Sequence, residues 1–247
     1  MKSHMICYVS IYEARNRVFA TGIPFSDFIE GIPVKPENLL LMSSYFYNGK
    51  LEKNTGFEYV DRPLFEQLSA DDIAGYGNFS WVDFENVADL EEVTEVEISE
   101  MLYADYRGKA LKSPFFDSVR NRYMYLAHDD DWMCTLYMRT VRDYRYVIAQ
   151  RLQREIMGRR KTIAPIPDEI LNVLFDYAAR GVVFDFSAAG ENLIGIWEVG
   201  NYDDFHYDIM HKEFDRLNER HLDKKLNTLE YSPRSKKWKL WNAVPAK

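Results

Sequence analysis

The segment Arg122–Met157 constrains the fold most, because it predicts a strand, a polar tip, a second strand and a helix in direct succession. Apolar and aromatic residues fill Arg122–Ala127 and Trp132–Met138, and the polar run His128–Asp131 separates them. Strands that are apolar on both faces are typical of burial between two layers. Apolar residues then recur at helical spacing at Val141, Tyr144, Ile148, Leu152 and Ile156. We therefore expect a buried hairpin followed by a helix over residues 140–157.

A second hairpin with a following helix is predicted further along the chain. Val182–Phe186 and Asn192–Val199 flank a turn of small residues, and Phe205, Ile209 and Phe214 begin the apolar face of a helix over residues 203–221. The two hairpins indicate either a repeated supersecondary plan or the coincidence that any α+β chain can produce.

The whole pattern predicts an α+β fold, in which antiparallel β-hairpins form one or two sheets packed against about five helices. An N-terminal hairpin is expected over Ile6–Ile23 and a last one over Leu226–Trp241. The short polar stretch Gly108–Pro114 is the best candidate for a boundary. We expect an N-terminal lobe over residues 1–112 and a C-terminal lobe over 113–247, or one continuous domain. The helices are expected at 62–74, 94–107, 140–157, 168–180 and 203–221.

The net charge of −8 argues against general attraction to nucleic acid or to an anionic membrane, since both require clustered cations. Arg159–Lys161 and Lys236–Lys239 are the two candidate basic patches, and three charges apiece are more typical of a helix end or a solvated strand. Cys7 and Cys134 lie in apolar runs, so a reducing cytoplasm is expected. No apolar run approaches the length of a membrane span.

The residues Asp89–Glu100 form an acidic run with six carboxylates. Thr94 and Glu97 match a capping box, and Ile98, Met101 and Leu102 are expected to face inward. Such a run is typical of a solvated helix start, and a cation site or a mimic of nucleic-acid charge is the alternative.

The tip His128, Asp129, Asp130, Asp131 and Trp132 is the one cluster that could carry recognition or chemistry. On an extended backbone Asp129 and Asp131 share a face, where they could offer two oxygens to a divalent metal ion. Further ligands would then have to come from elsewhere, for example Asp83 and Glu85 or Asp203 and Asp204. The simpler interpretation is a hairpin tip, where Asp is expected. Phosphate-binding glycine loops, Cys-x-x-Cys and His-Glu-x-x-His are absent from the sequence.

Two phrases, Tyr76–Glu85 and Arg122–Trp132, resemble those of a family of uncharacterised soluble proteins from endospore-forming bacteria, some of which carry the label "oxalate:formate antiporter". The resemblance covers much of the chain and implies a bacterial, cytoplasmic setting. It implies no activity and no functional residue.

We expect a cytoplasmic, non-enzymatic binding protein of a regulatory or immunity type, with another protein as its partner and no cofactor. Its acidic and aromatic surface, with the tip 128–132, would carry recognition. The alternative is a divalent-metal-dependent hydrolase centred on Asp129 and Asp131.

Overall fold

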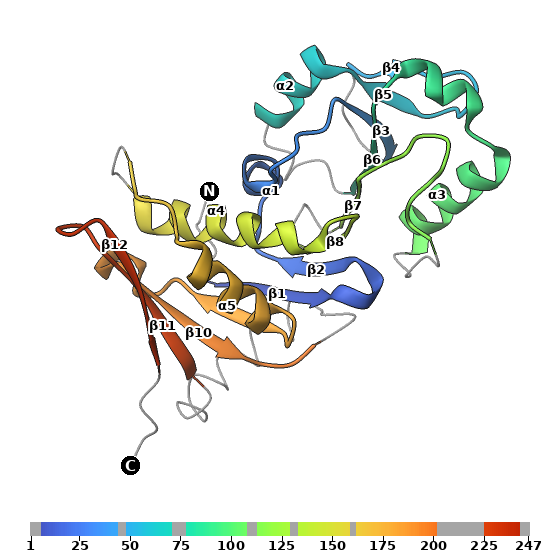
Figure 1. Cartoon of the computed structure of the whole chain (residues 1–247). Helices are drawn as coiled ribbons and strands as arrows, with labels where there is room; N and C mark the ends of the chain where they lie inside the picture. The colour runs from blue at the N-terminus through green and yellow to red at the C-terminus, as the bar shows by residue number, and fades with distance from the viewer. Residues whose placement is uncertain are drawn as a thin grey trace. The chain divides into compact units, whose positions relative to one another are not determined.

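The protein has the predicted α+β fold, and it divides into two compact units (Figure 1). The computed structural model describes residues 6–43, 48–70, 78–107, 113–128, 133–158, 162–201 and 225–242. The central unit is Tyr12–Asp143, and the terminal unit combines Met1–Ile11 with Tyr144–Lys247. Every strand pairing within either unit is antiparallel across the described residues.

The central unit is built on a sheet with the strand order β2-β8-β7-β6-β3-β5-β4. Its strands are β2 (Arg17–Thr21), β3 (Asn38–Ser43), β4 (Lys50–Leu51), β5 (Glu58–Val60), β6 (Phe79–Phe84), β7 (Tyr123–His128) and β8 (Met133–Met138). Its helices are α1 (Phe25–Gly31), α2 (Arg62–Ala70) and α3 (Glu95–Arg107), with the 3-10 turns η1 (Glu13–Arg15), η3 (Val87–Glu92) and η4 (Val141–Asp143).

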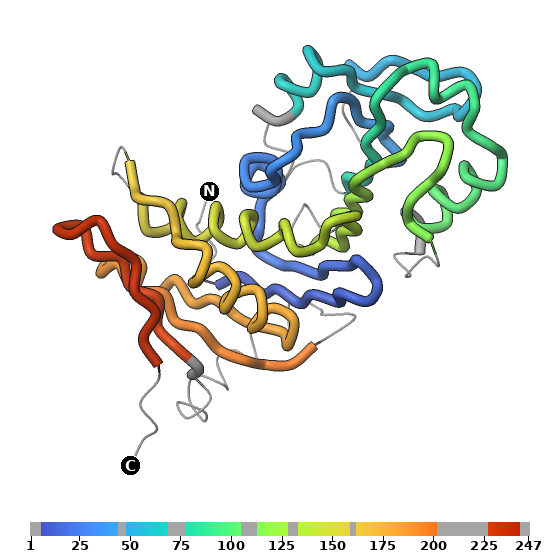
Figure 2. Tube along the Cα trace, in the orientation of Figure 1, coloured from blue at the N-terminus to red at the C-terminus, as the bar shows by residue number. Residues whose placement is uncertain are grey.

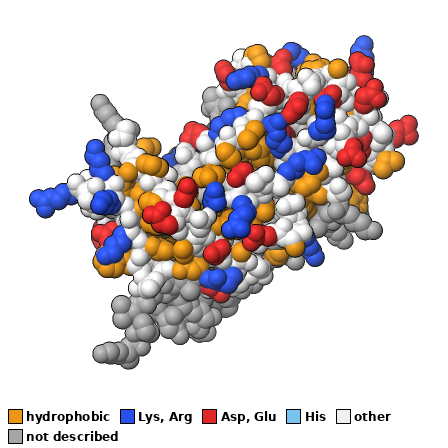
Figure 3. Space-filling model, in the orientation of Figure 1, with side chains coloured by type: hydrophobic (Ala, Val, Ile, Leu, Met, Phe, Trp, Pro, Cys, Tyr) orange, Lys and Arg blue, Asp and Glu red, His pale blue; other side chains and the backbone are white. Residues whose placement is uncertain are grey.

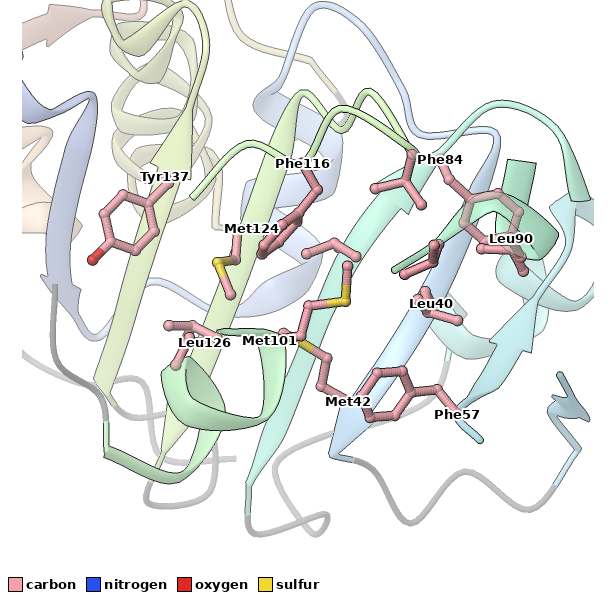
Figure 4. Packing of buried hydrophobic residues seen from close by; sticks show 14 residues of the cluster. Leu40, Met42, Phe57, Phe84, Leu90, Met101, Phe116, Met124, Leu126 and Tyr137 are labelled. Carbon is pink, nitrogen blue, oxygen red and sulfur yellow. The ribbon is translucent and has the colours of Figure 1, made fainter. Parts of the chain in front are cut away.

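One face of this sheet packs beneath α3, η3 and the segment that precedes β7 (Figure 4). Alternate residues of β3, β6 and β7 supply the sheet side of the cluster, and Met101 and Ala104 supply the helix side, each fully buried. The cluster consists of Leu40, Met42, Phe57, Val82, Phe84, Leu90, Val93, Met101, Ala104, Phe116, Val119, Met124, Leu126 and Tyr137. The period-two alternation of the strands therefore places one apolar set against α3.

The opposite face carries an aromatic cluster that packs beneath α1. Trp81 and Tyr125 pair across β6 and β7, and their rings stack with centroids 5.4 Å apart and an interplanar angle of 7°. Phe25 and Phe28 of α1 contact both of these rings, and Phe25 also meets the Phe79 ring edge-on at 5.1 Å. The expected hairpin is thus buried on both of its faces, which confirms that prediction.

The terminal unit has the strand order β12-β11-β10-β9-β1. Its strands are β1 (Ile6–Tyr12), β9 (Val182–Asp185), β10 (Leu193–Glu198), β11 (Lys225–Ser232) and β12 (Lys237–Asn242), and its helices are α4 (Tyr144–Met157) and α5 (Asp168–Ala178), with the 3-10 turn η5 (Ala189–Glu191). Figure 2 shows the first strand, drawn in blue, beside the orange β9, with which it pairs from Ile6 opposite Asp185. This unit therefore needs both ends of the chain.

Polar contacts join α5 and the segment that precedes it to the sheet of the terminal unit. The Asn227 amide donates to the Tyr177 hydroxyl of α5, and the Trp238 indole donates to the Ala164 carbonyl oxygen at 2.7 Å. Within α4, Arg151 is almost fully buried, forms an ion pair with Glu155 and lies over the Phe186 ring. A buried arginine that is paired and stacked in this way is structural.

A glycine lies in the connection from α5 to β9. Gly181 has φ +79°, and its carbonyl oxygen accepts hydrogen bonds from the N–H groups of Val199 and Gly200. A Cβ atom at this position would lie 1.9 Å from the Gly200 carbonyl oxygen. No other residue type fits there without backbone movement.

The element predictions differ from the structure mainly at their ends. The helix expected at 140–157 begins with η4 before it becomes α4, and the one expected at 168–180 ends at Ala178. Residues 71–77, the boundary stretch 108–112 and the expected helix 203–221 lie outside the described residues, so the lobe boundary at 112 stays a prediction. Among the helices that the structure describes, none combines the length and apolar composition needed to cross a membrane.

Candidate functional site

The predicted recognition tip follows a hairpin whose strands the structure describes up to their ends. Strands β7 and β8 pair from Tyr123 opposite Met138 to His128 opposite Met133. Asp129, Asp130, Asp131 and Trp132 join these strands and lie outside the described residues, as does the His128 side chain. The recognition role and the metal site at Asp129 and Asp131 therefore both stay predictions.

The additional ligands suggested for that metal site are engaged elsewhere or lie outside the described residues. Within the described ranges, no three His, Cys, Asp or Glu side chains lie close enough together to hold a metal ion. Glu85 forms an ion pair with the Arg122 guanidinium. Asp203 and Asp204 belong to a stretch that is not described.

Asp83 is a buried carboxylate of the central unit, as is Asp27 of α1, and the surroundings of Asp83 give it a structural role. It lies on β6 with 3% of its surface exposed, and its Oδ1 accepts hydrogen bonds from the N–H groups of Arg122 at 2.8 Å and Tyr123 at 2.6 Å. Burial raises the pKa of Asp83 from 3.8 to about 6, although the two amide hydrogen bonds act in the opposite direction. The side chain fixes the start of β7 against β6, and its burial leaves no access for a substrate.

The strongest candidate for a functional surface is the solvent-facing side of the segment Glu85–Tyr103, which we call the α3 surface. From Glu85 to Tyr106 the sequence holds no Lys, Arg or His. Glu91, Glu92, Glu95 and Glu100 are all exposed. Figure 3 shows acidic side chains around α3, with hydrophobic side chains among them.

Exposed hydrophobic side chains concentrate on this same surface. Of the seven large hydrophobic residues exposed among those described, four belong to it: Val87 (43%), Val96 (68%), Leu102 (48%) and Tyr103 (50%). Apolar residues scattered singly are normal on a protein surface, whereas exposed apolar residues that gather on one segment are a feature of interaction sites. Their position within an acidic segment makes the surface amphipathic.

Hydrogen bonds at its N-terminus hold α3 in place. Thr94 Oγ1 accepts the Glu97 N–H, and the Glu97 carboxylate accepts the Thr94 N–H at 2.9 Å, which confirms the predicted capping box. The same carboxylate accepts hydrogen bonds from the Ser118 N–H and hydroxyl. Partial burial raises the pKa of Glu97, but these hydrogen bonds outweigh it and lower the pKa below its usual value. Glu97 therefore supports the helix and is not part of its free acidic face.

Among the described residues, the cations that pair with the acidic segment do so near its beginning. Arg120 pairs with Asp89 at 3.1 Å, and Arg122 pairs with Glu85. The Asn54 amide and the Ser118 hydroxyl donate to the backbone carbonyl oxygens of Glu91 and Glu92. Among the described residues, no hydrogen bond or ion pair is found to the carboxylate of Glu91, Glu92 or Glu100. These carboxylates are available to a cationic partner.

The basic cluster near the C-terminus is a weaker candidate. Lys236, Lys237 and Lys239 are exposed on the β11–β12 hairpin, and the Lys239 ammonium lies over the Trp241 ring. Three cations and one ring are too few for the phosphate contacts that nucleic-acid binding needs. The other basic cluster, Arg159–Lys161, lies outside the described residues.

Sequence reasoning identified the acidic run and its capping box but not the exposed apolar residues. The expectation that Leu102 faces inward is wrong, since it is 48% exposed, whereas Met101 is fully buried and Ile98 is half-buried. The signal was present in the spacing. Met101 and Ala104 lie three residues apart on one helix face, and Leu102 lies about 100° away from Met101.

Comparison with protein-family models, with curated proteins and with solved structures finds no match to this chain. The family resemblance noted in the sequence therefore stays an expectation.

Proposed function

We propose that this protein is a non-enzymatic, cytoplasmic binding protein, of a regulatory or immunity type, whose α3 surface binds a basic protein. The observation that carries the proposal is the coincidence of exposed carboxylates and exposed hydrophobic side chains on one continuous segment, Glu85–Tyr103. Carboxylates select a cationic partner and accelerate its association, while apolar contacts retain it.

The chemistry of the described residues favours binding over catalysis. The buried carboxylate Asp83 is occupied by backbone amides, and the buried Arg151 is paired with Glu155. Cys7 and Cys134 form no disulfide and lie in buried strands, as expected of small core residues in a reducing compartment. The tip 128–132 stays a second predicted contact region for the same partner.

The competing proposal of a metal-dependent hydrolase predicts a different result, a change in melting temperature on addition of a divalent metal ion. If Asp129 and Asp131 bind Mg²⁺ or Mn²⁺, the ion should raise the melting temperature, and Asp129→Asn should abolish that rise. A melting temperature that no divalent ion changes would remove the hydrolase proposal and leave the binding proposal intact.

The binding proposal is tested by capture on immobilised protein followed by calorimetry at low salt. The test variant replaces Glu91, Glu92, Glu95 and Glu100 with Gln. The matched control neutralises four exposed acids elsewhere, namely Glu13, Glu169, Asp176 and Glu191. We expect to capture a basic protein that binds the wild type and the control variant. The test variant should not retain this protein, and its affinity for the wild type should fall as the salt concentration rises. Absence of any basic ligand, or equal retention by both variants, would contradict the proposal.

A further inference from the structure

We infer that the α3 surface binds one amphipathic helix of the partner, with an apolar stripe flanked by Lys or Arg. The inference rests on the proposed function and adds the shape of the partner to its charge. An acidic surface alone would accept any cationic chain, whereas apolar residues arranged along α3 select a partner of matching shape.

The exposed residues of α3 form a stripe at helical spacing. Val96, Ser99 and Tyr103 follow the i, i+3, i+7 pattern and so lie on one face, opposite the buried Met101. Glu100 lies on one side of this stripe and Glu95 on the other. An apolar seam bordered by charges is the pattern by which one helix recognises another, with the bordering charges selecting the partner.

Ser99 is the polar residue within the stripe, and removing it from water leaves its hydroxyl hydrogen-bonded. The Ser99 hydroxyl donates to the Glu95 carbonyl oxygen at 2.7 Å, so its hydrogen bond is made inside the helix. A partner that covers Ser99 leaves no hydrogen-bond donor unpaired. Because the Ser99 side chain is small, the partner can approach α3 closely at this position, between Val96 and Tyr103. The stripe can therefore be buried at little polar cost.

The length of the helix sets the length of its partner. The 13 residues of α3 extend for about 20 Å, which matches three to four turns of a second helix. The capping box and the Ser118 contacts hold α3 before binding, so little ordering is required of this side of the interface. The resulting contact is small, which is typical of a transient complex.

The probe for this inference is a synthetic Leu/Lys heptad peptide of about 20 residues, long enough to form a helix in water. A second peptide has the same composition in a scrambled order that presents no apolar face. Binding of each labelled peptide to the full chain is measured by fluorescence anisotropy at about 50 mM and about 500 mM salt. We expect the heptad peptide to bind at least about tenfold more tightly than the scrambled one.

Four double substitutions, two tests and two controls, locate the contact. Val96→Ser with Tyr103→Ser should weaken the heptad peptide by about tenfold and leave the scrambled peptide unchanged. The control Val34→Ser with Leu51→Ser removes two hydrophobic side chains that are 45% and 69% exposed elsewhere, and it should change neither affinity. Glu95→Gln with Glu100→Gln should weaken both peptides, whereas Glu13→Gln with Glu191→Gln should not.

The outcomes separate this inference from the proposed function. The inference of a helical partner is wrong if the two peptides bind equally and Val96→Ser with Tyr103→Ser changes neither affinity. If Glu95→Gln with Glu100→Gln still weakens both peptides, the acidic binding surface remains supported. Failure of both peptides to bind at low salt would count against the surface itself.

Discussion

Asp83 is buried, although aspartate side chains are usually exposed to solvent. A carboxylate is rarely buried without a cation, yet this one is held by the N–H groups of Arg122 and Tyr123. These two amides begin β7 and would otherwise need other acceptors. Asp83 therefore positions the start of β7, and ionisation of its buried carboxyl group lowers the stability of the folded protein in a pH-dependent way.

This cost predicts an unusual pH dependence for stability. Because folding raises the pKa of Asp83 from 3.8 to about 6, the folded protein holds this proton more tightly than the unfolded chain. The contribution to stability is therefore present at low pH and is lost as pH rises through about 6. Between about pH 4.5 and pH 7.5 the loss amounts to about 2 kcal/mol.

Urea unfolding of the wild type and Asp83→Asn at these two pH values measures the effect. Asparagine keeps an oxygen acceptor for both amides but cannot titrate. We expect the stability of the wild type relative to the variant to fall by about 2 kcal/mol from the lower to the higher pH. Other carboxylates contribute equally to both proteins, so a difference independent of pH would contradict the raised pKa of Asp83.

At the scale of elements, one face of α3 packs against the core and the opposite face is exposed to solvent. Met101 and Ala104 pack into the core, and Glu97 binds Thr94 and Ser118, so the helix is anchored by residues that no partner needs to touch. Val96 and Tyr103 are left free to face solvent. An interaction surface on such a helix can change in sequence without loss of the fold.

Removing the anchor should destabilise the protein more than removing a surface charge. Glu97→Ala loses the hydrogen bonds from Thr94 and Ser118, and we expect it to lower the free energy of unfolding by about 1–2 kcal/mol. The control Glu100→Ala, one turn along the exposed side, should stay within about 0.5 kcal/mol of the wild type. Urea unfolding of both variants makes the comparison.

The defect of Glu97→Ala should also depend on pH in the direction opposite to that of Asp83. Hydrogen bonding lowers the pKa of Glu97 below its ordinary 4.5, so its stabilisation is present above that value and is lost as pH falls through the lower, folded-state value. A defect that persists undiminished in acid would show that the carboxylate charge has no part in the anchor.

At the scale of the whole molecule, the two units differ in how the chain supplies them. The central unit, Tyr12–Asp143, is continuous in sequence and contains both the cluster under α3 and the aromatic cluster under α1. The terminal unit takes β1 from the start of the chain and its other strands from after Tyr144. Its buried residues include Ile6, Cys7 and Tyr8.

This difference predicts unequal behaviour of the two fragments. A fragment of residues 12–143 should give one cooperative thermal transition with the near-ultraviolet circular dichroism of packed aromatic rings. A fragment of residues 144–247 should not, because it lacks β1, which pairs with β9. The opposite result, or cooperative folding of both fragments, would contradict this account of the units.

Much of the local structure could be predicted from the sequence. The hairpin at residues 122–138, the hairpin at 182–198 and the capping box at Thr94 all follow from patterns within a few residues of one another. The candidate surface was predicted only in part, since the acidic run was recognised but the outward position of Leu102 was not. The exposed face of a helix depends on which sheet it packs against, and that contact joins residues far apart in sequence.

The sequence by itself determined the α+β class, the antiparallel hairpins and the position of α3, because side-chain periodicity, turns and caps act over a few residues. Only the tertiary structure decided that β6 lies between β3 and β7, that Asp83 is buried against the start of β7, and that Val96 and Tyr103 face solvent among carboxylates. These features arise from pairing across long stretches of chain, where the free energy depends on the packing of the whole unit and not on local preference.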